Sequence, residues 1–152
     1  SLRDPQAPLL ATHARMSEQK GLDTLLRAFS RVKETHSGAR LRIVGDGPER
    51  ASLEDLANEL GILESCEFPG FLIDPLAAIE EADLYVLSSR WEGLPNSLLE
   101  AIGVGLPVVS TRCPTGPDEI LLDGEEELVR RFRIVERLDA QGISRKKCAL
   151  FL

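Results

Sequence analysis

The chain has 152 residues, of which 43% are hydrophobic and 28% charged, and its formal net charge is −7. This composition is typical of one globular domain with its own core, and it excludes disordered and fibrous classes. No apolar run reaches the roughly 20 residues of a membrane-spanning helix, and the net negative charge argues against a nucleic-acid partner.

The cysteines indicate a cytoplasmic protein. Cys66, Cys113 and Cys148 are scattered and odd in number, which argues against a disulfide framework. They show no paired spacing typical of a zinc site. The first residues lack the basic segment and apolar stretch of a signal peptide. We therefore expect no metal, no cofactor and a cytoplasmic location.

Strand and helix patterns alternate along the first 124 residues. Short apolar runs predict strands, and apolar residues at helical spacing predict helices between them. Strands are expected over 9–14, 41–44, 66–68, 84–87 and 107–110. Helices are expected over 22–32, 53–60, 96–104 and 118–122, with a short one after Asp74-Pro75, a pairing typical of a helix start.

This alternation predicts an α/β fold, a Rossmann-like doubly wound parallel sheet with helices on both faces. We expect residues 1–124 to form this domain, with ligands bound at the carboxyl ends of the strands. Residues 125–152 are expected to form a charged helical tail, since seven basic and two acidic residues follow from Leu128 onward. Such a tail is either a solvated helix face or a peripheral contact with the inner face of an anionic membrane.

The loop after the first expected strand carries two cations, Arg15 and Lys20, followed by Gly21. Cations beside the start of a helix suit an anion, because the first N–H groups of a helix have no partner inside it. The guanidinium of Arg15 adds the geometry for two parallel hydrogen bonds to a phosphate. The alternative is a pair of surface cations flanking a turn.

The loop after the second strand, Gly45-Asp46-Gly47-Pro48, is glycine-rich. Glycine lets a backbone turn tightly or lets another group come close. The spacing differs from the dinucleotide fingerprint and from a P-loop. By itself this segment predicts a turn.

The third loop runs from Arg90 into the helix expected at Asn96, a favourable residue for the N-cap. Glu92 precedes this helix and Glu100 lies about one turn inside it, so both carboxylates could face one ligand. A carboxylate accepts two hydrogen bonds from a sugar or ribose diol. The alternative is a solvated Glu92 and a Glu100 that complements the helix dipole.

Together these segments resemble the GT-B-fold glycosyltransferases, specifically the retaining family 4 (group 1) enzymes, over about residues 9–123. Arg15 and Lys20-Gly21 match the family's Arg-x4-Lys-Gly pattern, and 41–48 match its second strand and turn. Glu92 and Glu100 match its Glu-x7-Glu pattern, and 101–109 match the helix and strand that follow. The resemblance implies that the chain is the C-terminal, donor-binding half of a GT-B fold.

The resemblance also implies roles for particular residues. Arg15, Lys20 and Glu92 would be catalytic, with the two cations neutralising the diphosphate and Glu92 contacting the donor sugar. Glu100 would bind the ribose. The other donor-binding residues would hold a phosphate at the start of the helix or border the base; they are Gly70, Phe71, Asn96, Ser97 and Leu98. No catalytic metal is implied, and residues 111–121 resemble members that use UDP-sugars for surface polysaccharides.

The sequence departs from the family in three respects. The acceptor-binding domain of such enzymes is missing from this chain. The segment 143–152 matches nothing in the family. If a strand of the family is lost here, one edge of the sheet would be left open. Ala14 stands where a glycine usually precedes the arginine. We therefore expect a donor-binding half that is inactive without an acceptor domain. The alternatives are a non-catalytic nucleotide-binding module, a truncated remnant, and an unrelated flavodoxin-like or receiver-type domain.

Overall fold

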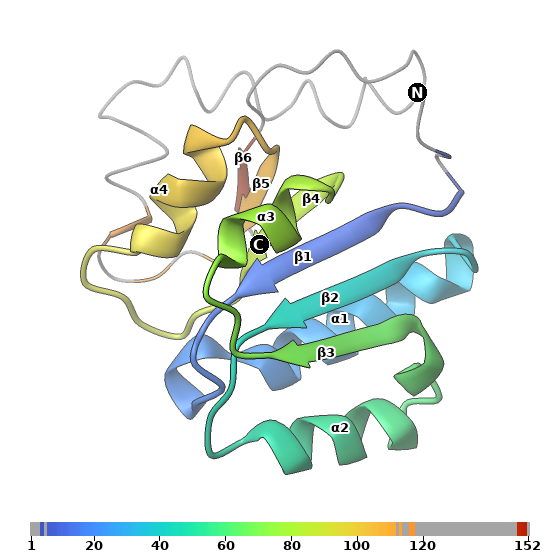
Figure 1. Cartoon of the computed structure of the whole chain (residues 1–152). Helices are drawn as coiled ribbons and strands as arrows, with labels where there is room; N and C mark the ends of the chain where they lie inside the picture. The colour runs from blue at the N-terminus through green and yellow to red at the C-terminus, as the bar shows by residue number, and fades with distance from the viewer. Residues whose placement is uncertain (1–3, 5, 112, 114–115, 118–148, 152) are drawn as a thin grey trace.

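The computed structural model describes residue 4 and residues 6–111, 113, 116–117 and 149–151 (Figure 1). One parallel sheet runs through these residues in the order β3-β2-β1-β4-β5-β6. Its strands are β1 Leu9–His13, β2 Arg40–Val44, β3 Cys66–Gly70, β4 Leu84–Leu87, β5 Val108–Ser110 and β6 Ala149–Phe151.

Helices cover both faces of this sheet (Figure 1). The helices are α1 Leu22–Thr35, α2 Arg50–Glu59, α3 Pro75–Glu80 and α4 Asn96–Gly103, with short 3-10 turns η1 Glu18–Lys20 and η2 Leu63–Ser65. The first two helices pack on one face, and α3 and α4 pack on the other. The predicted class, a doubly wound Rossmann-like sheet, is confirmed.

The central strands β1 and β4 are largely apolar because both of their faces are buried, whereas β2 and β3 carry Arg40, Arg42 and Glu67. Successive side chains of a strand point to opposite faces. In β1, Leu9 and Ala11 enter the core beneath α3 and α4, whereas Leu10 enters the core beneath α1 and α2. In β4, Tyr85 faces α3 and α4, and Val86 faces the other core. Two cores on one sheet therefore explain the unbroken apolar runs of the sequence.

The predicted start of α3 is confirmed in detail. Asp74 stands just before the helix, and its Oδ1 accepts a hydrogen bond of 3.2 Å from the backbone N–H of Ala77. Pro75 occupies the first helical position, where its missing N–H costs nothing. This cap sets where the chain leaves β3 and turns over the face of the sheet.

The end of the chain differs from the predicted tail. Residues 149–151 form β6, which pairs in parallel with β5, with Val109 opposite Leu150. This segment was expected to be helical, and the edge of β5 was expected to be open. An apolar tripeptide extends readily beside a strand that offers unpaired N–H and C=O groups. The helical piece predicted at 118–122 and the rest of the tail, up to residue 148, lie outside the described residues.

Among the residues that the model describes, no helix is both long enough and apolar enough to cross a membrane.

The buried phenol of Tyr85 should make stability fall at alkaline pH. Burial raises the pKa of this phenol, and hydrogen bonding with Ser97 and Thr12 offsets only part of that rise. An unfolded tyrosine ionises near pH 10, so above about pH 10 the unfolded chain releases a proton that the folded chain keeps, and the free energy of unfolding decreases.

The chain has one tyrosine, so the phenolate band of its ultraviolet absorbance reports this group alone. We expect the phenolate signal above pH 10 to appear together with loss of the helical circular dichroism. A phenolate that forms near pH 10 in a chain that is still fully folded would contradict the assignment.

Candidate functional site

The loops that follow the first three strands of the chain are joined at the carboxyl edge of the sheet. The backbone N–H of Gly45 donates to the carbonyl of Gly70 at 2.8 Å, and the N–H of Met16 donates to the carbonyl of Asp46 at 2.9 Å. A pocket of about 460 Å³ opens among them. Its lining residues are His13, Ala14, Arg15, Val44, Gly45, Asp46, Gly47, Phe71, Leu72 and Pro75.

Gly45 explains the glycine-rich turn after β2. Its φ is +126°, a backbone conformation that side chains rarely allow. A Cβ atom at this position would lie 2.0 Å from the carbonyl oxygen of Ala14. The group that comes close to this glycine is therefore the loop after β1, and the contact shapes one wall of the pocket.

The two cations of the first loop have different surroundings. Arg15 is exposed in the wall of the pocket, and its side chain makes no hydrogen bond or ion pair with any described residue. Lys20, five residues later, lies outside the pocket lining, and its Nζ is 2.7 Å from Oε1 of Glu92. Arg15 is thus available to an anion, whereas the charge of Lys20 is shared with a carboxylate.

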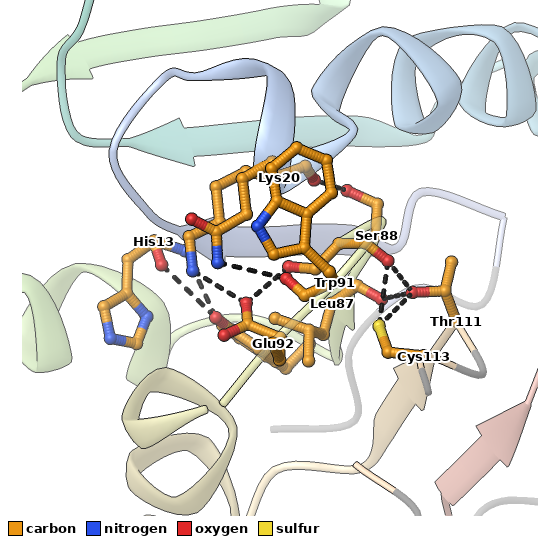
Figure 2. A network of polar contacts seen from close by, with 11 residues as sticks. His13, Lys20, Leu87, Ser88, Trp91, Glu92, Thr111 and Cys113 are labelled. Carbon is orange, nitrogen blue, oxygen red and sulfur yellow. Dashed lines mark hydrogen bonds and ion pairs between the residues drawn. The ribbon is translucent and has the colours of Figure 1, made fainter. Parts of the chain in front are cut away.

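Glu92 is a buried carboxylate whose polar partners include Lys20 and Ser89. Its side chain is 5% exposed, that of Lys20 is 20% exposed, and the hydroxyl of Ser89 donates to Glu92 Oε1 at 2.6 Å. Figure 2 shows Lys20 and Glu92 meeting between the loops after β1 and β4. A buried carboxylate is costly without such partners. The pair joins residues that are far apart in the sequence, and it also fixes the distance between these loops.

The end of β5 supports the same loop. Ser89 is also an acceptor, because its carbonyl receives hydrogen bonds from the hydroxyl of Thr111 at 2.6 Å and from the thiol of Cys113 at 3.0 Å (Figure 2). These contacts restrain the backbone of the loop that carries Glu92. The sequence patterns singled out neither Thr111 nor Cys113 for this role.

Glu100, the second carboxylate, bonds to a residue that sequence reasoning missed. Its Oε2 lies 2.7 Å from Nε2 of His13, the last residue of β1. The His13 side chain is 10% exposed and its ring meets that of Tyr85 edge to face, at 5.5 Å between centroids. The available signal was a polar residue at the carboxyl end of an otherwise apolar strand, where the fold places ligands.

The start of α4 corrects one expectation. Pro95 stands before the helix and Asn96 is its first residue, so Asn96 is not the N-cap and makes no capping hydrogen bond. The carbonyl of Pro95 accepts the N–H groups of Leu98 at 3.0 Å and Leu99 at 3.3 Å, which places the helix boundary at the proline. The Leu98 amide, expected to face a phosphate, therefore already has a partner. Ser97 hydrogen-bonds with the Tyr85 hydroxyl.

The loop after β3 supplies the other end of the pocket. Gly70 is buried at the end of β3 with φ +83°, and its carbonyl is the partner of Gly45. Phe71 is 79% exposed and lines the pocket. An exposed aromatic face beside a pocket suits stacking with a flat ring.

The predicted residues thus fall into three groups. Arg15 and Phe71 line the pocket, Lys20 pairs with Glu92 beside it, and Glu100 pairs with His13, which also lines the pocket. Within the described part of the chain, no three His, Cys, Asp or Glu side chains are grouped so that they could hold a metal ion.

This doubly wound, Rossmann-like parallel sheet matches part of the GT-B structures of glycosyltransferases. The chain belongs to the family Glycosyl transferases group 1, whose model matches residues 1–146.

Two curated relatives show how much of such proteins the chain represents. It is 43% identical to an uncharacterized glycosyltransferase of Methanocaldococcus jannaschii, over 70% of this chain and 26% of that protein. It is 37% identical to the lipopolysaccharide core biosynthesis glycosyltransferase LpsE of Rhizobium meliloti, over 91% of this chain and 38% of LpsE. The chain therefore spans between a quarter and two fifths of these relatives.

Solved structures agree. The lipopolysaccharide outer core galactosyltransferase WaaB in its apo form matches with a TM-score of 0.68 and 28% identity, over 77% of this chain and 33% of WaaB. The pneumococcal O-GlcNAc transferase GtfA, solved in complex with UDP and GlcNAc, matches with a TM-score of 0.69 and 23% identity, over 79% of this chain and 24% of GtfA. At that identity the GtfA match shows the fold alone.

Gly21 should tolerate alanine far less than Gly61 does. Both have left-handed backbones, with φ +57° and +70°, so alanine is strained at either by about 1–2 kcal/mol. A Cβ on Gly21 would also lie 2.2 Å from the carbonyl oxygen of Ser88, whereas one on Gly61 meets nothing within 4 Å.

We expect Gly21→Ala to lose roughly 1–3 kcal/mol of unfolding free energy beyond the loss in Gly61→Ala, as overpacking does elsewhere. Urea denaturation of the two variants measures the difference. Equal losses would mean that the loops after β1 and β4 are not in contact at Gly21.

Proposed function

We propose that this chain is the donor-binding half of a retaining glycosyltransferase that takes a nucleotide-diphosphate sugar, with a UDP-sugar favoured. One observation carries the proposal: Arg15 is exposed in the wall of the carboxyl-edge pocket, and its guanidinium makes no hydrogen bond or ion pair with any described residue. An exposed guanidinium beside the start of a helix is suited to a phosphate. Lys20 lies on the same loop.

In this proposal the cations act on the leaving group. As the bond between the sugar and the diphosphate breaks, negative charge grows on the diphosphate, and Arg15 and Lys20 stabilise it with no reorganisation of water. Lys20 is fixed for this role by Glu92, at 2.7 Å. Glu92 contacts the donor sugar after a rearrangement that exposes its carboxylate, which is now buried against Lys20 and Ser89. Glu100 accepts hydrogen bonds from the ribose hydroxyls.

The remaining donor contacts lie at the two ends of the site. Phe71 and Gly70 border the base, a role supported by the exposure of Phe71 in the pocket lining. The start of α4, with Asn96, Ser97 and Leu98, faces a phosphate. Because the Leu98 amide is bonded to Pro95, this contact requires a small rearrangement or falls to the neighbouring amides.

The substrate class rests on the relatives. LpsE is described as a lipopolysaccharide core biosynthesis enzyme, and GtfA was solved with UDP and GlcNAc. The likeness to LpsE supports a role in surface polysaccharide or glycoconjugate synthesis. The likeness to GtfA shows the fold alone, so the UDP-sugar donor depends on the resemblance of residues 111–121. Because the chain spans only part of each relative, glycosyl transfer further requires an acceptor-binding domain. The cytoplasmic location, with peripheral contact at the inner face of the membrane, belongs to the same proposal.

Arg15→Ala should weaken UDP binding without changing stability. Removing a hydrogen bond to a charged group costs about 1.5–3 kcal/mol of binding free energy, a loss of roughly tenfold or more in affinity. Calorimetric titration with UDP, GDP and ADP measures the affinity, and urea denaturation measures the stability.

Arg27→Ala is the matched control, because Arg27 is also exposed but lies on α1 outside the pocket lining. An affinity for UDP that is unchanged in Arg15→Ala would show that Arg15 is not part of the site. If the folded parent chain bound no nucleotide, the chain would be a remnant of the fold. Binding without transfer, even when an acceptor domain is supplied, would indicate a non-catalytic nucleotide-binding module.

Glu100→Gln should weaken the binding of UDP much more than that of pyrophosphate, because only UDP carries the ribose hydroxyls that donate hydrogen bonds to this carboxylate. A conservative amide keeps the size of the side chain, so the loss reports charge and hydrogen bonding. Parallel titrations with the two ligands measure the effect, with Glu59→Gln, an exposed residue of α2, as the control. Similar losses for both ligands would exclude the ribose role.

A further inference from the structure

We propose that His13 is a positioning residue for the donor nucleoside: it holds the Glu100 carboxylate so that this carboxylate is ready for the ribose. The inference rests on the proposed function, since it concerns the same site. His13 lies on β1 and Glu100 on α4, and their side chains meet at the carboxyl edge of the sheet.

The hydrogen bond with His13 restrains the Glu100 side chain, which makes no other hydrogen bond with a described residue. Nε2 of His13 and Oε2 of Glu100 are 2.7 Å apart. The glutamate is 46% exposed, and a glutamate on an open helix surface has several rotamers, whereas the histidine is 10% exposed. The buried partner therefore anchors the exposed one. Oε1 of Glu100 has no hydrogen bond with any described residue and stays available to a ligand.

The surroundings of the His13 ring determine which ring nitrogen donates to Glu100. An ionised carboxylate only accepts hydrogen bonds, so Nε2 must be the donor. The other nitrogen, Nδ1, is buried and has no hydrogen-bond partner among the described residues. A proton there would be a buried donor without an acceptor, which is costly. The ring thus bonds to Glu100 through its Nε2–H.

The packing of the ring keeps this donor aimed at Glu100. The rings of His13 and Tyr85 meet edge to face with an angle of 64° between their planes, and Tyr85 is itself fully buried in the core beneath α3 and α4. Figure 2 shows the ring pointing away from Lys20 and Glu92. His13 also lines the pocket beside Arg15, so one residue connects the pocket wall with the carboxylate expected to bind the ribose.

This arrangement lowers the cost of binding. A ligand that must immobilise a flexible side chain loses affinity, and a side chain that is already held avoids that loss. We expect His13→Ala to weaken UDP by about three- to tenfold and to leave pyrophosphate unchanged. His13→Gln should retain most of the affinity, because its amide nitrogen is as many bonds from the backbone as Nε2 and can donate to Glu100.

The experiment compares UDP with 2′-deoxy-UDP by calorimetric titration of the parent chain, His13→Ala, His13→Gln and Glu100→Gln. His36→Ala is the control, since His36 is the other histidine and follows α1. We expect the preference of the parent chain for UDP to shrink in His13→Ala and in Glu100→Gln and to persist in His13→Gln. A preference that shrinks in Glu100→Gln but is unchanged in His13→Ala overturns the positioning role, as do equal losses in the alanine and glutamine variants.

Nitrogen NMR of the labelled parent chain tests the hydrogen bond without any variant. The Nε2–H form of His13 at neutral pH is the expected result, and an Nδ1–H form overturns the proposal. A parent chain that binds UDP and 2′-deoxy-UDP equally would refute the ribose role of Glu100, and with it this use of His13. If the parent chain bound neither nucleotide, the donor-binding function itself would fail, while the NMR result would still decide how His13 and Glu100 interact.

Discussion

The buried ion pair of Lys20 and Glu92 determines how the site is assembled. Glu92 is almost inaccessible to water, so its charge requires the ammonium 2.7 Å away and the hydroxyl of Ser89. The pair ties the loop after β1 to the loop after β4, two strands that are neighbours in the sheet. The close contact of Gly21 with Ser88 reinforces this junction. The same interaction that satisfies a buried carboxylate thus sets the position of the cation that would meet a diphosphate.

The sheet places every candidate residue at one edge. Parallel strands all end on the same side, and β1 lies at the centre, between β2 and β4. His13, at the end of β1, consequently reaches the pocket on one side and Glu100 on the other. The exposed Arg15 and the paired Lys20 follow on the next few residues. Because β1 is central, its last residue and the polar loop after it lie near the positions expected for the base, the ribose and the diphosphate.

Much of the fold could be predicted from local patterns. The apolar runs of β1 and β4 are strands because both of their faces are buried, and the spacing of Leu22, Leu25, Leu26 and Phe29 matches the buried face of α1. The start of α4 at Asn96 was predicted, but Asn96 is not its N-cap, because the carbonyl of Pro95 accepts the N–H groups of Leu98 and Leu99. The strand at 149–151 was missed because its short apolar run gains a partner only from the distant β5.

The sequence by itself determined the fold class and the chemical character of the loops, since periodicity and residue type are local properties that survive without any knowledge of contacts. It located Arg15, Lys20 and Glu92 in the loops after strands and Glu100 in the helix that follows one of these loops. Only the tertiary structure decided which of these charged side chains form ion pairs and which remain exposed. Lys20 and Glu92 meet, Arg15 remains exposed, and the carboxylate of Glu100 is held by His13. The physical reason is that burial and charge pairing depend on groups brought together across the sheet, and no local pattern encodes those distances.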